Sequence, residues 1–265
     1  MNAMQPDDDI IFGAGPAAIP ARKPLTGPMY REFVRVVASV KRARSYLEVG
    51  VYNASTLSII ECASIGVDPE FAFDRNPMGK KPSLRLYQMT SDDYFRDHDP
   101  RTDFGGPVDV AFLDGMHLFE YLLRDFINTE RACAPGSVIL LDDCLPINIE
   151  MAERERRPHL RKDRAVAAWW TGDVWKVLHI LREYRPELKI VPVDVVPTGS
   201  IAVTNLDPDS TRLQDAYDEI VARYMDMELT PALFDQHWID FAPLPVPAAV
   251  PALFPNVVVK RAGAS

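Results

Sequence analysis

The sequence predicts an α/β protein with a doubly wound, mostly parallel sheet of seven strands, of which the last is antiparallel. Two observations indicate this fold. Short apolar runs that suit buried strands alternate with longer segments that suit helices over most of the chain. Polar residues, several of them aspartates, follow the ends of the apolar runs, where ligands bind in parallel α/β sheets.

The first half of this pattern contains four strands. Each is a short apolar run, and the helix before the first strand has apolar residues three and four positions apart. The predicted strands cover residues 46–51, 64–68, 84–88 and 108–113. The predicted helices cover 29–44, 55–61 and the short stretch that opens at 92–95.

The second half contains three strands and two longer helices. Pro135-Gly136 predicts a turn, and the continuous apolar run after it is typical of a strand buried in a parallel sheet. The linker Val-Pro-Thr-Gly between the last two strands favours an antiparallel pair. The predicted strands cover 137–141, 188–195 and 200–204, and the helices cover 118–133 and 163–184.

Proline is the abnormal entry in the composition, with 23 residues concentrated at the two ends. We therefore predict an irregular Pro/Gly-rich arm over 1–28, one domain over 29–205, and a helical and Pro-rich extension over 206–265. Within the extension, 206–240 suits one or two helices, and 243–255 is expected to be irregular. The flanking segments are too small for a second catalytic domain, and they suit covering a site or building a homo-oligomer.

Charge and composition exclude several classes of protein. The net charge of −9 argues against binding to nucleic acid or to an anionic membrane, because both require a basic surface. No run approaches the roughly 18 apolar residues of a membrane helix, and the acidic start differs from a signal peptide. Cys62, Cys133 and Cys144 lack metal-type spacing, which favours free thiols in a reducing cytoplasm.

The end of the first strand carries the first candidate binding residues. Glu48 and Gly50 end the strand, and Gly50 permits close approach of a ligand to the backbone. N–H groups beyond it, around Asn53 and Ser55, can meet a carboxylate or phosphate. The full G-x-G-x-x-G pattern of dinucleotide sites is absent, which weakens a nicotinamide interpretation.

The next two strands also end in polar residues. Asp68 ends the second strand, where an acidic side chain can accept the hydroxyls of an adenosine ribose. Ser91 and Asp92 follow the third strand and can contact an adenine edge. Their alternative role is to cap the helix that opens at Asp93.

The most informative residues follow the fourth and fifth strands. Asp114 ends one strand and Asp142-Asp143 the other, and neighbouring strands lie about 5 Å apart. Three converging carboxylates favour a divalent cation with oxygen ligands, Mg²⁺, Mn²⁺ or Ca²⁺, although both adjacent aspartates can ligate only if the strand has already ended. His117 lies in the same loop as Asp114 and suits proton removal near pH 7. The alternative role of this group is helix capping and turn formation.

Four segments of the sequence resemble the class I S-adenosylmethionine-dependent methyltransferases, with a Rossmann-like fold, over roughly 45–205. They are Tyr46-Leu-Glu-Val-Gly50, Gly66-Val-Asp-Pro69, Leu113-Asp-Gly-Met-His117 and Leu140-Leu-Asp-Asp143. More narrowly they resemble the metal-dependent small-molecule O-methyltransferases that act on sugars. The sequence departs from the family's glycine-rich first loop, with Ala54 where a second glycine often stands.

This resemblance implies S-adenosylmethionine (SAM) as cofactor, Mg²⁺ as metal and transfer of a methyl group to a hydroxyl. It implies that His117 is the general base, with Asp114 beside it, and that the metal is held by Asp114, Asp142 and Asp143. The residues that it places around the cofactor are Glu48, Gly50, Asp68, Ser91 and Asp92, to which Asn53, Ser55 and Asp114 are added as candidates.

The same residues are also compatible with other functions. A nicotinamide-dependent oxidoreductase uses the same fold and an acidic residue such as Asp68. A glycosyltransferase would use the Asp142-Asp143 pair for a metal-bound nucleotide sugar, and a non-catalytic binding module would keep the fold alone.

Further marked residues have structural and functional interpretations. The charge run over 153–164 is either a solvated surface or a lid whose arginines hold an anionic substrate. Trp169, Trp170 and Trp175 are expected on the helix that follows, in the core or against an acceptor pocket. The other histidines, at 98, 159, 179 and 237, are expected to be structural.

Overall fold

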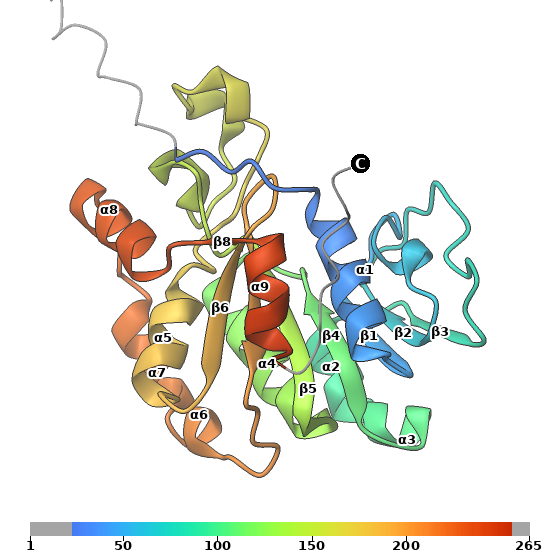
Figure 1. Cartoon of the computed structure of the whole chain (residues 1–265). Helices are drawn as coiled ribbons and strands as arrows, with labels where there is room; N and C mark the ends of the chain where they lie inside the picture. The colour runs from blue at the N-terminus through green and yellow to red at the C-terminus, as the bar shows by residue number, and fades with distance from the viewer. Residues whose placement is uncertain (1–22, 256–265) are drawn as a thin grey trace, which may run out of the picture.

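The computed structural model describes residues 23–255, and these form one mixed sheet between two layers of helices (Figure 1). The order of the strands is β3-β2-β1-β4-β5-β7-β6-β8. Their bounds are β1 Ser45–Val49, β2 Ala63–Val67, β3 Leu84–Tyr87, β4 Val108–Leu113, β5 Cys133–Asp142, β6 Lys189–Asp194, β7 Ser200–Thr204 and β8 Leu244–Pro245. β7 is antiparallel to β5 and β6, whereas the other pairs are parallel.

The mostly parallel α/β fold is therefore confirmed, including the antiparallel pair of β6 and β7. The sheet has one strand more than the seven expected, because the two-residue β8 pairs with β6 at the edge. The predicted turn at Pro135-Gly136 is wrong. β5 runs through these residues, with an irregularity in its register against Val108 and Val110 of β4.

Helices cover both faces of the sheet. α1 and α9 pack on one face, and α2, α4, α5 and α7 pack on the other. Their bounds are α1 Tyr30–Lys41, α2 Ser91–Asp97, α3 Pro100–Phe104, α4 Phe119–Ala132, α5 Lys176–Tyr184, α6 Arg212–Asp215, α7 Tyr217–Tyr224, α8 Pro231–Asp240 and α9 Val246–Leu253. This is the doubly wound arrangement that the alternation of strands and helices predicts.

Alternation along the central strands fixes which side chains face each layer. In β4, Val110 and Phe112 belong to the core under α1, whereas Ala111 and Leu113 belong to the core under α4. The register pairs Val49 with Leu113 and Leu113 with Leu141. The residues after these three strands therefore emerge together at one edge of the sheet, as the sequence predicted.

Two predicted helices are wrong, because most of each segment forms short 3₁₀ turns and irregular loops instead. In place of a helix over 55–61 there is a single 3₁₀ turn, Leu57–Ile59, since Ala54 has a φ of +62° and β2 begins at Ala63. In place of a helix over 163–184 only α5 forms. Residues 149–175 instead carry three short 3₁₀ turns, at Ile149–Ala152, Pro158–Leu160 and Arg164–Val166.

The Pro-rich stretch over 243–255 is not irregular, so that expectation is also wrong. It forms β8 and then α9, in which Pro247 lies in the first turn, where a missing N–H costs nothing. Pro251 lies inside the helix, but Ala249, Val250 and Leu253 are buried in the core under α1 and α9. Burial of this apolar face offsets the hydrogen bond that Pro251 removes.

The described end of the N-terminal arm lies against the β6–β7 connection. The Asp194 carboxylate accepts hydrogen bonds from the N–H groups of Thr26 and Gly27, at 2.8 and 3.0 Å. Backbone hydrogen bonds also join Pro28 and Tyr30 to Val196. Residues 23–30 are thus tied across the carboxyl edge of the sheet, and the rest of the predicted arm, 1–22, lies outside the described residues, as do 256–265.

Two further expectations concern the whole chain. Cys62, Cys133 and Cys144 are free thiols, as predicted. Between residues 23 and 255 no helix has the length and apolarity needed to cross a membrane.

Candidate functional site

An acidic cavity of about 760 Å³ lies at the carboxyl ends of β1, β2, β4 and β5. Its volume is within the range of small-molecule and cofactor sites. Among the described residues that line it there is no lysine or arginine, whereas there are five aspartates: Asp68, Asp92, Asp114, Asp142 and Asp143. The cavity therefore favours a ligand that carries positive charge.

Gly50 shapes one wall of this cavity. It has a φ of +91°, and a Cβ built on it would lie 1.8 Å from the carbonyl oxygen of Asp114. The chain segments after β1 and β4 are in direct contact here, since the N–H of Asp114 also donates to the carbonyl of Val49 at 2.8 Å. Only glycine fits this position.

Asp68 lies at the cavity with its carboxylate held in place. Its Oδ2 accepts a hydrogen bond from the N–H of Tyr52, and its Oδ1 accepts one from the N–H of Glu70, both at 2.8 Å. Each carboxylate oxygen has a second lone pair for a ligand hydroxyl.

Ser91 and Asp92 also line the cavity. They do not cap α2, because the N-cap is Thr90, whose hydroxyl accepts from the N–H of Asp93 at 3.1 Å. The Asp92 carboxylate accepts two hydrogen bonds from the guanidinium of Arg124, at 2.8 and 2.6 Å. Arg124 thus offsets the charge of this aspartate at the cavity.

Three other residues predicted near the cofactor are not among those that line the cavity. Glu48 is buried, and its Oε2 accepts a hydrogen bond from the hydroxyl of Tyr46 at 2.5 Å. Burial raises the pKa of Glu48 to about 8, although the hydrogen bond from Tyr46 acts in the opposite direction. Asn53 accepts from the N–H of Ser55 at 3.0 Å, which is a local turn rather than a contact with the cavity.

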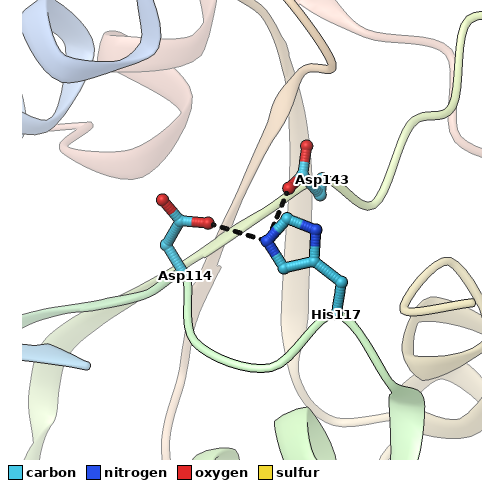
Figure 2. Close-up of side chains that lie close together, drawn as sticks. All are labelled: Asp114, His117 and Asp143. Carbon is cyan, nitrogen blue, oxygen red and sulfur yellow. Dashed lines mark ion pairs between the residues drawn. The ribbon is translucent and has the colours of Figure 1, made fainter. Parts of the chain in front are cut away.

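Asp114, His117 and Asp143 converge on one point (Figure 2). The Nε2 atom of His117 lies 3.5 Å from Oδ1 of Asp114 and 3.2 Å from Oδ2 of Asp143. One ligand atom from each residue lies within 4.8 Å of the others, a spacing that suits a metal ion. Asp143 has a φ of +60°, so the chain turns sharply as β5 ends.

A backbone carbonyl fixes which nitrogen of His117 faces the carboxylates. Nδ1 lies 2.7 Å from the carbonyl oxygen of Trp170, which can only accept, so Nδ1 carries a proton and donates it. The two rings also stack, with centroids 5.1 Å apart. Burial lowers the pKa of His117, but Asp143, Asp114 and the Trp170 carbonyl outweigh it and raise that pKa to about 10. The carboxylates thus attract positive charge to this point.

Asp142 lies outside this group of three, although it lines the same cavity. β5 continues through Asp142, which pairs in register with Ser200 of β7. Its Oδ1 accepts a hydrogen bond from the Ser200 hydroxyl at 2.9 Å. β5 ends at Asp142, and the positive φ of Asp143 turns the chain there, so the group of three contains Asp143 and His117 where the sequence predicted Asp143 and Asp142.

The segment over 149–175 supports His117. A Cβ on Gly172 would lie 1.7 Å from the carbonyl oxygen of His117, and that oxygen accepts from the N–H of Asp173 at 3.3 Å. The Asp173 carboxylate accepts from the N–H of Phe119 at 3.0 Å and from Arg154 at 2.6 Å. Sequence reasoning missed these supports, and its only signal was the Trp-Thr-Gly-Asp string at 170–173.

α8 supports the chain just after Asp143. His237 Nε2 donates to the carbonyl oxygen of Cys144 at 3.0 Å, and Trp238 Nε1 donates to that of Pro146 at 3.0 Å. His179 Nε2 lies 2.9 Å from Nδ1 of His237. His179 and His237 were expected to be structural, and the structure supplies the partners that the sequence did not reveal.

The three tryptophans have different environments. Trp175 is buried, as expected for core packing, whereas Trp169 is 42% exposed and Trp170 stacks on His117. Trp175 is the N-cap residue of α5, and the other two precede that helix instead of lying on it.

Residues 47–144 match a family model described as a methyltransferase domain. No curated protein matches the sequence. Solved structures with a similar arrangement include the O-methyltransferase from Bacillus cereus in complex with SAH, at 14% identity over 70% of this chain and 83% of that one, with a TM-score of 0.47. TomG from Streptomyces achromogenes, an O-methyltransferase involved in tomaymycin synthesis, is 13% identical over 66% of this chain and 78% of that one, with a TM-score of 0.44. The SAH-bound methyltransferase PaMTH1 from Podospora anserina is 15% identical over 67% of this chain and 78% of that one, with a TM-score of 0.45.

The matched segment extends from β1 to the end of β5. It therefore contains Gly50, Asp68 and the three residues of the Asp114, His117 and Asp143 cluster. The strand order of this chain itself establishes the fold. On this α/β fold, residues 47–144, which contain most of the residues that line the acidic cavity, match a methyltransferase domain.

Proposed function

We propose that the protein transfers the methyl group of SAM to a hydroxyl oxygen of a small molecule, with assistance from a divalent cation. The acidic lining of the cavity is the observation that carries this proposal. A sulfonium cofactor is positively charged, so five aspartates without a lining lysine or arginine among the described residues attract it. The same lining repels the pyrophosphate of a nicotinamide dinucleotide or of a nucleotide sugar.

The cofactor would lie at the β1–β2–β3 end of the cavity. Asp68 has free lone pairs for ribose hydroxyls, Ser91 and Asp92 suit the base, and the backbone at Gly50 permits close approach. Glu48 is buried behind this wall, so its role in the proposal is to support β1 rather than to bind the cofactor.

The cation would be held by the carboxylates of Asp114 and Asp143. Their oxygens suit Mg²⁺, Mn²⁺ or Ca²⁺, and one carboxylate oxygen from each lies within 4.8 Å of the other, which leaves room for one ion between them. A divalent cation supplies positive charge that lowers the pKa of a bound hydroxyl. Asp142 would lie behind these two ligands, where its side chain is held by Ser200 and where burial, Asp114 and Asp143 raise its pKa well above the ordinary value.

His117 would take the proton of the acceptor. Its Nδ1 proton is committed to the Trp170 carbonyl, so Nε2 is the nitrogen that would accept one. A cation held by Asp114 and Asp143 would offset the carboxylates that raise the pKa of His117, and so would leave Nε2 without a proton before the acceptor binds. Nε2 faces the cavity beside both carboxylates. The acceptor oxygen would lose its proton to Nε2, and bound SAM would supply the methyl group that this oxygen takes up, with its sulfonium leaving as a neutral thioether.

The test is methyl transfer from SAM with a labelled methyl group to a set of hydroxyl compounds, with and without a chelator. We expect label on oxygen and loss of transfer when divalent cations are removed. Label on nitrogen or carbon would contradict the O-methyl assignment. Transfer that is unchanged by the chelator would contradict the role of the cation.

A further inference from the structure

A second cavity, of about 480 Å³, adjoins the acidic one. Pro197, in the connection between β6 and β7, lines both of them. The second cavity lies between this connection, the end of the N-terminal arm and the segment over 149–175. It is therefore on the side of the Asp114, His117 and Asp143 cluster and away from Asp68 and Ser91.

The side chains that line this second cavity are mostly apolar. Lys23 is the one charged residue among those that line it, and its ammonium is engaged, 2.6 Å from Oδ1 of Asp235 and 5.6 Å from the centre of the Phe234 ring. The apolar lining is formed by Pro24, Leu25, Ile147, Ala165, Val166, Trp169, Val196 and Pro197. A sugar would lose hydrogen bonds to water on every face here without replacement.

Two arginines of the segment over 149–175 are engaged in ion pairs within the protein. Arg154 pairs with Glu120 at 2.6 Å and with Asp173 at the same distance. Arg161 is buried and pairs with Glu153 at 2.9 Å. These two arginines of the charge run over 153–164 therefore stabilise the segment itself and are not available to an anionic acceptor.

We propose that the second cavity binds the body of the methyl acceptor, and that this body is a flat, uncharged aromatic ring system. The proposal rests on the proposed function. Trp169 lines the cavity with 42% of its surface exposed, and the rings of Pro24 and Pro197 offer further flat apolar surfaces. Trp169 is adjacent to Trp170, which stacks on His117, so a ring bound here can present its hydroxyl to the cluster.

The test uses naphthalene-2,3-diol as an aromatic probe and methyl glucoside as a sugar probe, both of which carry neighbouring hydroxyls. Calorimetry on the full chain in the presence of SAH and Mg²⁺ measures their binding. Ala165→Trp fills the cavity from an exposed position, and Ala168→Trp is the matched control, exposed on the same segment but not part of the lining. Trp169→Ala removes the aromatic wall instead of filling the space.

We expect the naphthalenediol to bind the wild type and the Ala168→Trp variant alike. Ala165→Trp should weaken its binding by about tenfold or more, and Trp169→Ala by about fivefold. Equal binding to Ala165→Trp and wild type, or preference for methyl glucoside, would overturn the proposal. SAH affinity measured on the same samples distinguishes failure of the proposed function from failure of this inference. Loss of SAH binding would contradict the proposed function, whereas the probe reports on the second cavity alone.

Discussion

The proposed cofactor end and the proposed acceptor end of the site, called below the cofactor end and the acceptor end, are built in different ways. At the cofactor end, Gly50, Asp68 and Ser91 each follow a parallel strand, so the register of the sheet brings them together. At the acceptor end, His117 and Asp143 are held by residues far away in the sequence. Trp170 fixes the imidazole of His117, and His237 fixes the chain after Asp143.

Because of this difference, substitutions at the acceptor end should disturb the sheet less than substitutions at the cofactor end. Altering the cofactor end disturbs the strand ends and the core below them, since Gly50 contacts Asp114 directly. The acceptor end depends on loops, on α8 and on the segment over 149–175, whose replacement leaves the sheet intact. Substitutions at the two ends should therefore have separable effects on cofactor binding and on turnover.

The largest effect is expected for Asp143→Asn. Asparagine tolerates the positive φ at this position, so the variant removes one negative charge and keeps the backbone. Turnover should fall by about a thousandfold, because several kcal/mol of charge stabilisation are lost. Calorimetry should show weaker Mn²⁺ binding and unchanged SAH binding. Full activity with normal Mn²⁺ affinity would show that Asp143 is not part of the site.

His117→Ala should lower kcat by about a hundredfold, which is within the range for loss of a general base. Mn²⁺ and SAH affinities should stay within about threefold of the wild type. If Mn²⁺ binding disappears together with turnover, the imidazole is a metal ligand and not the base. Full activity with the true acceptor would make both assignments wrong.

A matched pair of glycine variants compares the two ends directly. Gly50→Ala and Gly172→Ala each force alanine into a positive φ, +91° and +55°, and each places a Cβ within 2 Å of a backbone oxygen, at 1.8 and 1.7 Å. Gly50→Ala should lose SAH binding, because it displaces the strand ends around the cofactor. Gly172→Ala should keep SAH binding and lower kcat by about tenfold, because it moves the loop that carries His117. The same pattern for both variants would contradict a division of the site into two ends.

The smallest effect concerns stability and pH. Burial lowers the pKa of His237 to about 4, with further lowering from His179 and Arg182 and opposition from the Cys144 carbonyl and Asp240. A histidine whose pKa is depressed in the folded state stabilises the fold above its ordinary pKa of 6.5 and loses that contribution as the pH falls toward 4. Between pH 7 and 5 the wild type should therefore lose about 2 kcal/mol more unfolding free energy than His237→Gln. Urea titrations at the two pH values measure this difference, and parallel losses would refute it.

The sequence was sufficient for the cofactor end because its signals are local. Apolar runs located β1, β2, β3 and β4 within a residue or two, and the polar residue after each run then followed from sheet geometry. Asp68 and Ser91 line the cavity for this reason. Glu48 does not, because its side chain shares a face with Tyr46 and points into the core under α1.

The acceptor end was harder because its contacts are not local. Asp142 and Asp143 are equivalent in the sequence, and only the extent of β5 and the partner Ser200 distinguish them. The helix expected over 163–184 begins only at Lys176, because Gly172 has a φ of +55° and the N–H of Asp173 donates to the carbonyl of His117. The α9 helix could not be predicted from its proline-rich sequence, because it is stabilised by burial of its apolar face rather than by helix propensity.

Titration of the full chain with SAH and, separately, with NAD⁺ tests the central claim most directly. The proposed cofactor site at Gly50 and Asp68 predicts that SAH binds at one site per chain, with heat detectable by calorimetry, and the acidic lining predicts that NAD⁺, which carries a pyrophosphate, gives none. Binding of NAD⁺ in place of SAH, or no binding of SAH to folded protein, would contradict the account.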